Sequence, residues 1–185
     1  MGVFYTNFSL QDVSADDVVR FLRDEGKVGV ICPERNGWVA ISLEETEGQH
    51  PLLVELAAKS FSQAFGCVVF AVLNHDDDVL AYWLANKGEV SDRYVSHPGL
   101  LEGRDDPPEG GDSRVLSKII GRPEAAAELD VVLSLRGIAE CFSALEHHAA
   151  LVRMLGLPPF TVGLDSSGNS PMPDELDESE IIEVF

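Results

Sequence analysis

Hydrophobic residues in the first part of the chain follow the spacing of short strands. Residues 3–10 are rich in β-branched and aromatic side chains, which favours a strand. Residues 27–33 and 38–43 predict two further strands around an Asn-Gly pair, the strongest short signal for a hairpin turn. Residues 67–73 form a continuous apolar run, which is typical of a strand buried on both faces.

Two helices are predicted between these strands. Ser14 is a suitable N-cap, with two aspartates in the following turn, where the positive end of the helix dipole favours carboxylates. Gly26 fits the position just after the end of that helix. Pro51 fits the first turn of a second helix, which Gly66 ends. The second helix carries apolar residues at helical spacing: Leu52, Leu53, Leu56, Ala57, Phe61, Ala64 and Phe65.

The order of these elements predicts the fold class. A strand, helix, strand, strand, helix, strand sequence is the order of the ferredoxin-like split βαβ arrangement. Residues 79–85 and 90–96 predict two more strands that extend one edge of the sheet as an antiparallel hairpin. The prediction is therefore an α+β fold, with a mainly antiparallel sheet in ferredoxin-like βαββαβ order, extended by a hairpin and followed by C-terminal helices.

The second half of the chain is predicted to be helical after a loop. Residues 98–112 contain three prolines, four glycines and five acidic residues, which predicts a loop. Helices are expected at residues 113–120, 123–135 and 138–155. The last of them has an apolar stripe of Ile138, Phe142, Leu145, Ala149, Val152 and Leu155. We therefore divide the chain into a sheet-and-helix core (1–97), an acidic Gly/Pro loop (98–112), a helical portion packed on the same core (113–164) and an acidic tail (165–185).

The acidic tail divides into two parts. Residues 165–180 have little to bury, so we expect them to be largely disordered. The last six residues differ, because four of them are apolar: Ile181, Ile182, Val184 and Phe185. These side chains either dock on the protein's own surface or are held for another chain. We favour docking as an added strand.

Composition and cysteine content are those of an ordinary globular protein. The chain has 185 residues, of which 45% are hydrophobic and 24% charged, so no disulfide or metal is needed to stabilise a core. Its three cysteines, Cys32, Cys67 and Cys141, are far apart and lack metal-ligand spacing. We expect buried free thiols and a cytoplasmic location. No apolar run approaches the ~18 residues of a membrane span.

The charge balance is unusual. The chain has 13 Lys and Arg against 32 Asp and Glu, which gives a net charge of −19. This excess argues against a protein that binds nucleic acid or an anionic membrane, since both kinds of binding use Lys and Arg. It speeds encounter with a cationic surface instead, and we expect a basic protein as a partner.

The densest polar cluster is at residues 74–78. Within it, His75, Asp76 and Asp78 are candidates for a divalent metal, because hard cations prefer several oxygen ligands. The alternative is a plain turn, since Asn and Asp are turn residues and neighbouring strand residues face opposite ways.

Three further histidines and four aromatic residues lie in the predicted elements. His97 ends a strand beside an acidic loop containing Glu102, Asp105 and Asp106, so it is either a base or switch whose pKa a carboxylate raises, or a structural turn residue. His147 and His148 are adjacent on a helix and so do not chelate together; we expect one near the apolar stripe and the other in solvent. The aromatic residues on the strands, Trp38, Tyr82, Trp83 and Tyr94, are predicted to be core unless one face of the sheet is uncovered.

Residues 75–158 resemble a family of uncharacterised bacterial proteins. The resemblance rests on the segments HDDDVLAYWLANKGEVSDRYVSHPGLLEG, GGDSRVLSKIIG and HHAALVRMLGLP. That family has no assigned activity, so the resemblance implies a bacterial source but no catalytic residue and no ligand.

Three functions are compatible with these features. The first, which we predict, is a non-enzymatic acidic module of the immunity or inhibitor type that covers a basic protein partner. The second is a metal-assisted hydrolase that uses the cluster at residues 74–78, with or without His97. The third is a ligand-sensing module with a pocket between the sheet and the C-terminal helices. No nucleophile elbow, Walker loop or dinucleotide fingerprint is present, so no cofactor is expected. The sequence does not indicate an oligomeric state.

Overall fold

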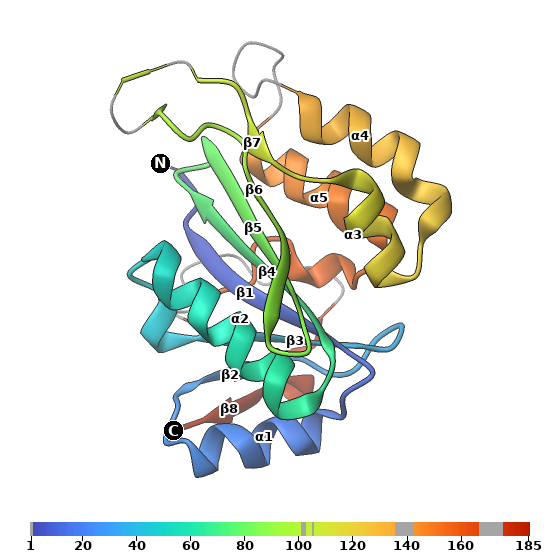
Figure 1. Cartoon of the computed structure of the whole chain (residues 1–185). Helices are drawn as coiled ribbons and strands as arrows, with labels where there is room; N and C mark the ends of the chain where they lie inside the picture. The colour runs from blue at the N-terminus through green and yellow to red at the C-terminus, as the bar shows by residue number, and fades with distance from the viewer. Residues whose placement is uncertain (1, 101–102, 105, 136–142, 167–175) are drawn as a thin grey trace.

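An antiparallel sheet is the central layer of the protein. The structure is a computed structural model, which describes residues 2–100, 103–104, 106–135, 143–166 and 176–185. Its strands are β1 (Tyr5–Gln11), β2 (Gly29–Ile31), β3 (Trp38–Leu43), β4 (Val68–His75), β5 (Val79–Asn86), β6 (Glu89–Val95), β7 (Glu109–Gly110) and β8 (Ile182–Val184). In the part of the chain that the structure describes, these eight strands form one sheet in the order β7-β6-β5-β4-β1-β3-β2-β8 (Figure 1).

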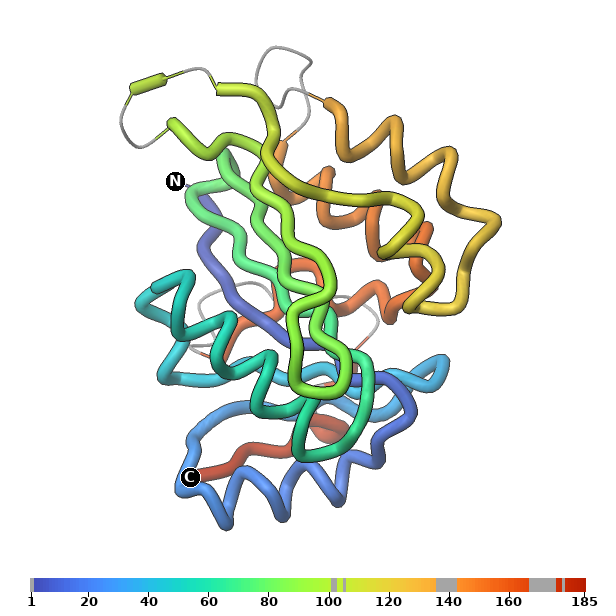
Figure 2. Tube along the Cα trace, viewed as in Figure 1, coloured from blue at the N-terminus to red at the C-terminus, as the bar shows by residue number. Residues whose placement is uncertain are grey.

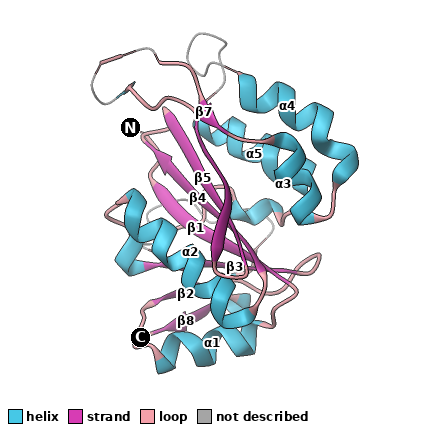
Figure 3. Ribbon diagram, viewed as in Figure 1, coloured by secondary structure: helices cyan, strands magenta, loops and turns pink. Residues whose placement is uncertain are grey.

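Helices cover both faces of this sheet. The first face carries α1 (Ala15–Asp24) and α2 (Pro51–Phe65), and the opposite face carries α3 (Ser113–Ile120), α4 (Ala126–Ser134) and α5 (Ala144–Leu155) (Figures 1 and 3). The connecting segments contain single 3-10 turns: η1 (Glu44–Thr46), η3 (Pro123–Ala125), η5 (Pro159–Thr161) and η6 (Glu178–Glu180). The tube in Figure 2 shows α1 and α2 separated along the chain from the three later helices. An α+β fold with an antiparallel sheet, extended by the β5–β6 hairpin, is confirmed.

Capping residues set the ends of the helices. The Ser14 side chain accepts a hydrogen bond from Asp17 N at the start of α1, and Gly66 ends α2 with a φ of 64°. α5 starts at Ala144, where the Ser143 and Glu146 side chains form a reciprocal capping box. The predicted helix of residues 138–155 is therefore wrong at residue 143, which precedes the helix. Residues 138–142 of that prediction lie outside the described residues.

Strand alternation divides the core into two main halves. On β5, Ala81 and Trp83 face α1 and α2, whereas Tyr82 and Leu84 face the three C-terminal helices. β4 is buried on both faces, as its continuous apolar run predicts. The four strand aromatics Trp38, Tyr82, Trp83 and Tyr94 are all buried, which confirms that they belong to the core.

The second helix does not bury its whole apolar face. α2 buries Val54, Ala57, Ala58, Phe61 and Ser62 against the sheet. Leu52, Leu53 and Leu56, which have the same helical spacing as the buried residues, remain 46–56% exposed. The helix predicted from this periodicity is confirmed, but these three leucines form an uncovered apolar surface, which we call the leucine face.

The C-terminal segment docks on the protein's own sheet. β8 pairs antiparallel with β2 at the edge, and Val184 lies in the core under α1 and α2. This confirms the predicted docking as an added strand. Leu176 is also buried, against Phe160 and Leu164, so the predicted disorder is wrong for residues 176–180. The remaining part of that prediction, at residues 167–175, lies outside the described residues.

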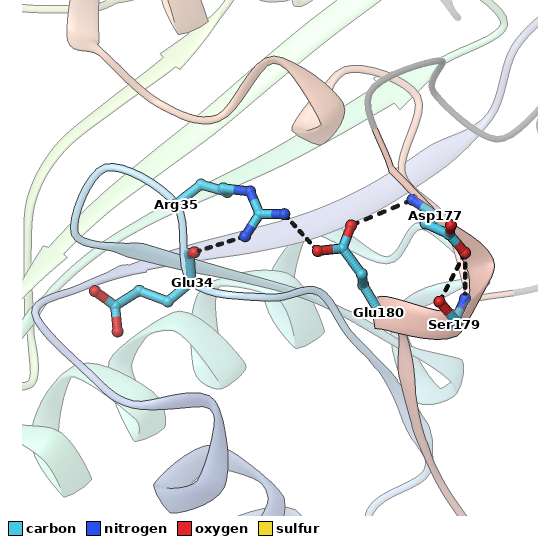
Figure 4. A network of polar contacts seen from close by, with 5 residues as sticks. All are labelled: Glu34, Arg35, Asp177, Ser179 and Glu180. Carbon is cyan, nitrogen blue, oxygen red and sulfur yellow. Dashed lines mark hydrogen bonds and ion pairs between the residues drawn. The ribbon is translucent and has the colours of Figure 1, made fainter.

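Polar contacts hold the approach to β8 (Figure 4). The Arg35 guanidinium in the β2–β3 turn forms an ion pair with the Glu180 carboxylate at 2.5 Å. Asp177 accepts hydrogen bonds from the backbone N–H and hydroxyl of Ser179, which close the η6 turn. The turn residues that the sequence predicts between β2 and β3 thus also anchor the C-terminal segment.

The predicted loop at residues 98–112 contains a short strand. Glu109 and Gly110 form β7, which pairs with Val95 and Tyr94 at the far edge of the sheet. The loop prediction is therefore wrong for these two residues. None of the helices described in the structure is long and apolar enough to cross a membrane.

We predict that the packing of β8 contributes to stability. Val184→Ala should lower the free energy of unfolding by about 1–3 kcal/mol, because it removes buried methyl groups. Phe185→Ala is the matched control, since its neighbouring ring is 91% exposed, and should change stability by less than ~0.5 kcal/mol. Urea denaturation measures both; equal effects would contradict the docking of β8.

Candidate functional site

Strand register brings two histidines to one end of the sheet. His75 pairs with Val79 across β4 and β5. Val95 of β6 pairs with Ala81, and the ladder continues where Ser96 N donates to Leu80 O at 2.8 Å. His97 therefore lies opposite Val79. His75 and Val79 face the side of the sheet that also carries α2, and His97, which follows the end of β6, joins them in lining one pocket.

A pocket lies over His75, Val79 and His97. It has a volume of about 500 Å³ and is lined by residues of β4, β5 and β6 and by Pro51, the first residue of α2. Figure 1 shows that these strands extend beyond the N-terminal end of α2. Its floor is apolar and continues the core beneath α2. Its walls come from the N-terminal segment, the turn before α2 and the chain after β6. The lining residues are Phe4, Glu47, Gly48, Gln49, Pro51, Leu73, His75, Val79, Ala81, Trp83, Val95, His97 and Pro98. We call this cavity the α2 pocket.

Hydrogen bonding fixes the tautomer of His75. Its Nδ1 lies 2.7 Å from Gln49 Oε1, which only accepts, so His75 Nδ1 carries the proton. In the neutral imidazole, Nε2 is then a hydrogen-bond acceptor. The edge of the ring also packs against Phe4, with 5.1 Å between ring centroids and an interplanar angle of 88°. The imidazole is therefore held in both orientation and protonation pattern.

Gln49 is the residue that holds His75 in place. Its Nε2 donates to Asn74 O at 2.6 Å and to Tyr5 O at 3.4 Å, which ties the turn before α2 to β4 and β1. These bonds also orient the amide so that Oε1 faces His75. The backbone of Gln49 has a φ of 52°, an uncommon conformation for a residue other than Gly, Asn or Asp. Such a backbone persists only where the surrounding structure holds it, and it often marks a functional site.

His97 is held by the backbone rather than by a carboxylate. It is 7% exposed, and its Nδ1 lies 3.1 Å from Asp78 O, so Nδ1 donates and Nε2 is again the acceptor. The expected neighbours were carboxylates of the acidic loop. Of these, Asp106 instead accepts a hydrogen bond from Arg104, and Glu102 and Asp105 lie outside the described residues.

The acidic residues between β4 and β5 form a turn. Asp76 and Asp77 both have positive φ, at 55° and 60°, which Asp tolerates well. Asp77 lies at the N-terminus of α5, where its Oδ1 accepts from Leu145 N at 2.7 Å and its carbonyl from Ala144 N at 2.9 Å. Asp76 and Asp78 are exposed and do not line the pocket. The turn alternative therefore accounts for all three aspartates.

The candidates for a metal do not converge in the described residues. No group of three or more His, Cys, Asp or Glu side chains lies close enough there to hold an ion. The described residues thus give the metal hypothesis no ligand set.

Both histidines of α5 are buried, so the expectation that one faces solvent is wrong. His148 Nδ1 lies 2.8 Å from the Tyr5 hydroxyl, and the His147 ring packs edge-on against Tyr94 at 5.5 Å. α5 is covered by the sheet on one side and by α4 on the other, so both adjacent positions are enclosed. Burial lowers the pKa of His147 to about 4, with a further contribution from His97, and that of His148 to about 3, with a further contribution from His147.

The side that we expected to carry the pocket is mostly packed. Between the sheet and the C-terminal helices, apolar side chains fill the interior. A polar hollow of about 490 Å³ remains at its edge, lined by Asp92, Asp112 and Asp130. Asp92 accepts from the Tyr82 hydroxyl at 2.6 Å and from Asp112 N, and Asp112 caps α3. Burial raises the pKa of Asp92, and these contacts give its carboxylate a structural role.

The described cysteines are placed as unreactive thiols. Cys32 is buried and Cys67 is half-buried, and both are free. Burial raises the pKa of Cys32 to about 12 and that of Cys67 to about 11, so neither forms a thiolate readily. Cys141 lies outside the described residues.

Sequence reasoning found the histidines of the α2 pocket but missed most of its walls. Phe4, Glu47 and Gln49 carry no motif, and they join the site only because η1 and the N-terminal segment meet the end of β4. Trp83 was expected in the core, and it is both 5% exposed and part of the pocket floor. The sequence feature that could have predicted their proximity is the position of His75 and His97 at the same end of the β4–β5–β6 meander, both at odd-numbered positions.

Comparisons with known proteins add no assignment. No protein-family model matches the chain, and neither the curated proteins nor the solved structures give a significant match.

We predict that the buried histidines make stability depend on pH. The unfolded chain protonates them below about pH 6.5, whereas the folded protein does so only near about pH 4 and 3, so the free energy of unfolding falls as the pH drops through this window. In His148→Gln, the slope between about pH 5 and 6.5 should decrease by up to ~1.4 kcal/mol per pH unit.

Urea denaturation at several pH values measures these slopes. His50→Gln is the control, because His50 is exposed and its side chain does not cap α2. An unchanged slope in His148→Gln would show that His148 is protonated as easily in the folded protein as in the unfolded chain.

Proposed function

We propose that the protein is a non-enzymatic binding module that holds a small molecule with an apolar body in the α2 pocket. The observation that carries this proposal is the combination of size and lining. A volume of about 500 Å³ falls within the ~300–1,000 Å³ typical of ligand sites, and such sites combine apolar walls with a few oriented polar groups. The α2 pocket has an apolar floor and two imidazoles of fixed tautomer.

The polar groups of the pocket favour binding over catalysis. None of the lining residues in the described part of the chain is Ser, Thr, Cys or Lys, the usual nucleophiles. His75 donates to an amide oxygen and His97 to a backbone carbonyl, rather than to the carboxylate that stabilises an imidazolium in a catalytic triad. These contacts orient the two rings as hydrogen-bond acceptors for a bound molecule.

The ligand-sensing hypothesis expected a pocket between the sheet and the C-terminal helices, whereas the α2 pocket lies on the other face of the sheet. The C-terminal helices fill their side of the sheet, while α2 ends before the strands do. The packed junction and the open end of α2 support a ligand site on the α2 face.

Filling the pocket tests the proposal. We expect the uncharged fluorophore N-phenyl-1-naphthylamine to bind the protein with single-site saturation and a blue-shifted emission. Ala81→Phe places a ring into the floor next to Leu73 and Val95, and should abolish this binding. Overpacking there should lower stability by about 1–3 kcal/mol, so binding is measured well below the melting temperature.

The control for this substitution is Ala127→Phe. Ala127 is exposed on α4, on the opposite face of the sheet, and the same change there should leave the affinity unaltered. Undiminished binding to a folded Ala81→Phe protein would place the fluorophore elsewhere and contradict the proposed function.

A second candidate is the acidic protein-binding module predicted from the charge. The observation that favours it is the leucine face, Leu52, Leu53 and Leu56, which adjoins the α2 pocket through Pro51. Neighbouring large apolar side chains that remain exposed often mark protein interaction sites. Combined with a net charge of −19, such a surface suits a partner with basic and apolar residues.

The leucine face makes a separate prediction. Immobilised protein should retain a basic partner from bacterial lysate at low ionic strength and release it at high ionic strength, because charge attraction between exposed groups is screened by salt. Leu52→Ser/Leu56→Ser should lose the partner, whereas Val131→Ser on α4, where the side chain is 61% exposed, should retain it. Equal retention by both variants would exclude the leucine face as the contact.

A further inference from the structure

The α2 pocket has a distinct charge character. Among the residues that the structure describes, its lining contains one carboxylate, Glu47, and neither Lys nor Arg. The adjoining turn adds the exposed carboxylates of Asp76 and Asp78. An anionic ligand would therefore meet like charge here without a compensating cation, in a protein whose net charge is −19.

Two basic side chains on this face are paired with carboxylates. Arg93 pairs with Trp83 in the strand register and forms an ion pair with Glu109 at 3.8 Å. Lys59 on α2 interacts with Glu89 at 3.9 Å. Both cations are thus balanced by carboxylates outside the pocket.

The two histidines offer hydrogen-bond acceptors, and the Trp83 indole N–H is a donor. The protons on Nδ1 of His75 and His97 are used by Gln49 Oε1 and Asp78 O, which leaves both Nε2 atoms as acceptors when the rings are neutral. A ligand that matches them must carry N–H or O–H donors. The floor adds Trp83, whose indole is the side chain that best attracts a cation over its face.

These features together define a class of ligand. Resting on the proposed function, we infer that the α2 pocket selects a small organic amine, with its apolar body on the floor and its protonated nitrogen at the polar rim. An ammonium group supplies three donors and a positive charge, so it can donate to an imidazole acceptor, and its charge is complementary to Glu47 and to the Trp83 indole. A neutral alcohol supplies one hydrogen-bond donor but no positive charge, and a carboxylate supplies neither.

Three probes of equal chain length test this inference: hexylammonium, hexanol and hexanoate. Each competes with N-phenyl-1-naphthylamine at about pH 8, where an alkylamine is protonated. Hexylammonium should displace the fluorophore at a concentration about tenfold lower than hexanol, the difference expected for a charge-assisted hydrogen bond. Hexanoate should compete more weakly than hexanol.

Glu47→Gln tests the charge directly. It should weaken the affinity for hexylammonium by about two- to fivefold, the range for an exposed charge pair. The affinity for hexanol should not change. Glu44→Gln is the matched control, because Glu44 is an exposed residue of the same short turn and does not line the pocket. It should change neither affinity.

The outcomes separate the inference from the proposed function. Equal competition by hexanol and hexylammonium, or tighter binding of hexanoate, would overturn the amine selectivity and leave the pocket as a ligand site. Failure of the fluorophore and of all three probes to bind would overturn both. Binding of Nα-acetyl-lysine amide but not of hexylammonium would assign the site to a side chain of a protein partner, and so overturn the inference of a free amine.

Discussion

The register of the β4–β5–β6 meander is the constraint on which the rest of the structure depends. Each strand is antiparallel to its neighbour, so residues of equal parity on the three strands face the same side, except at Val90, which lies beyond the register shift at Leu84/Ala85 and faces the same side as Ala85. One side carries Tyr82 and Tyr94 toward α5, and the other carries Ala81 and Trp83 toward α2. A shift of one residue in either pairing would exchange the two faces and bring polar side chains into both halves of the core.

The two faces are covered to different extents, and this difference creates the pocket. Among the described elements, three helices cover one side of the meander, and α2 covers the other but does not reach the end of the strands near Pro51. The exposed end is nevertheless stable, because the pocket is concave and its floor remains largely shielded: Leu73, Ala81 and Trp83 are each only 5–6% exposed. Burial at the floor is therefore almost complete even though a cavity lies above it.

Local signals in the sequence predict the fold well, and the site only in part. Ser14, the Asn-Gly turn before β3 and Gly66 act through their own backbone conformations, so the elements that they bound could be predicted without tertiary structure. The burial of α5 could not, because it depends on helices from distant parts of the chain covering both sides of His147 and His148. Gln49 was missed for the same reason: its role arises from contacts with Tyr5 and Asn74.

Charge and shape select partners at different distances. The net charge of −19 acts over the whole surface and attracts any cation, so by itself it distinguishes neither a protein from a small molecule nor one basic partner from another. The α2 pocket, by contrast, is local: it has an apolar floor and two imidazoles whose Nδ1 protons are used by the protein itself. In the proposed function, selectivity would depend on the pocket, while the acidic surface would increase the rate at which cationic molecules reach it. Salt screens the exposed charges but not the burial of an apolar body on the floor, so ionic strength would separate charge attraction from apolar contact.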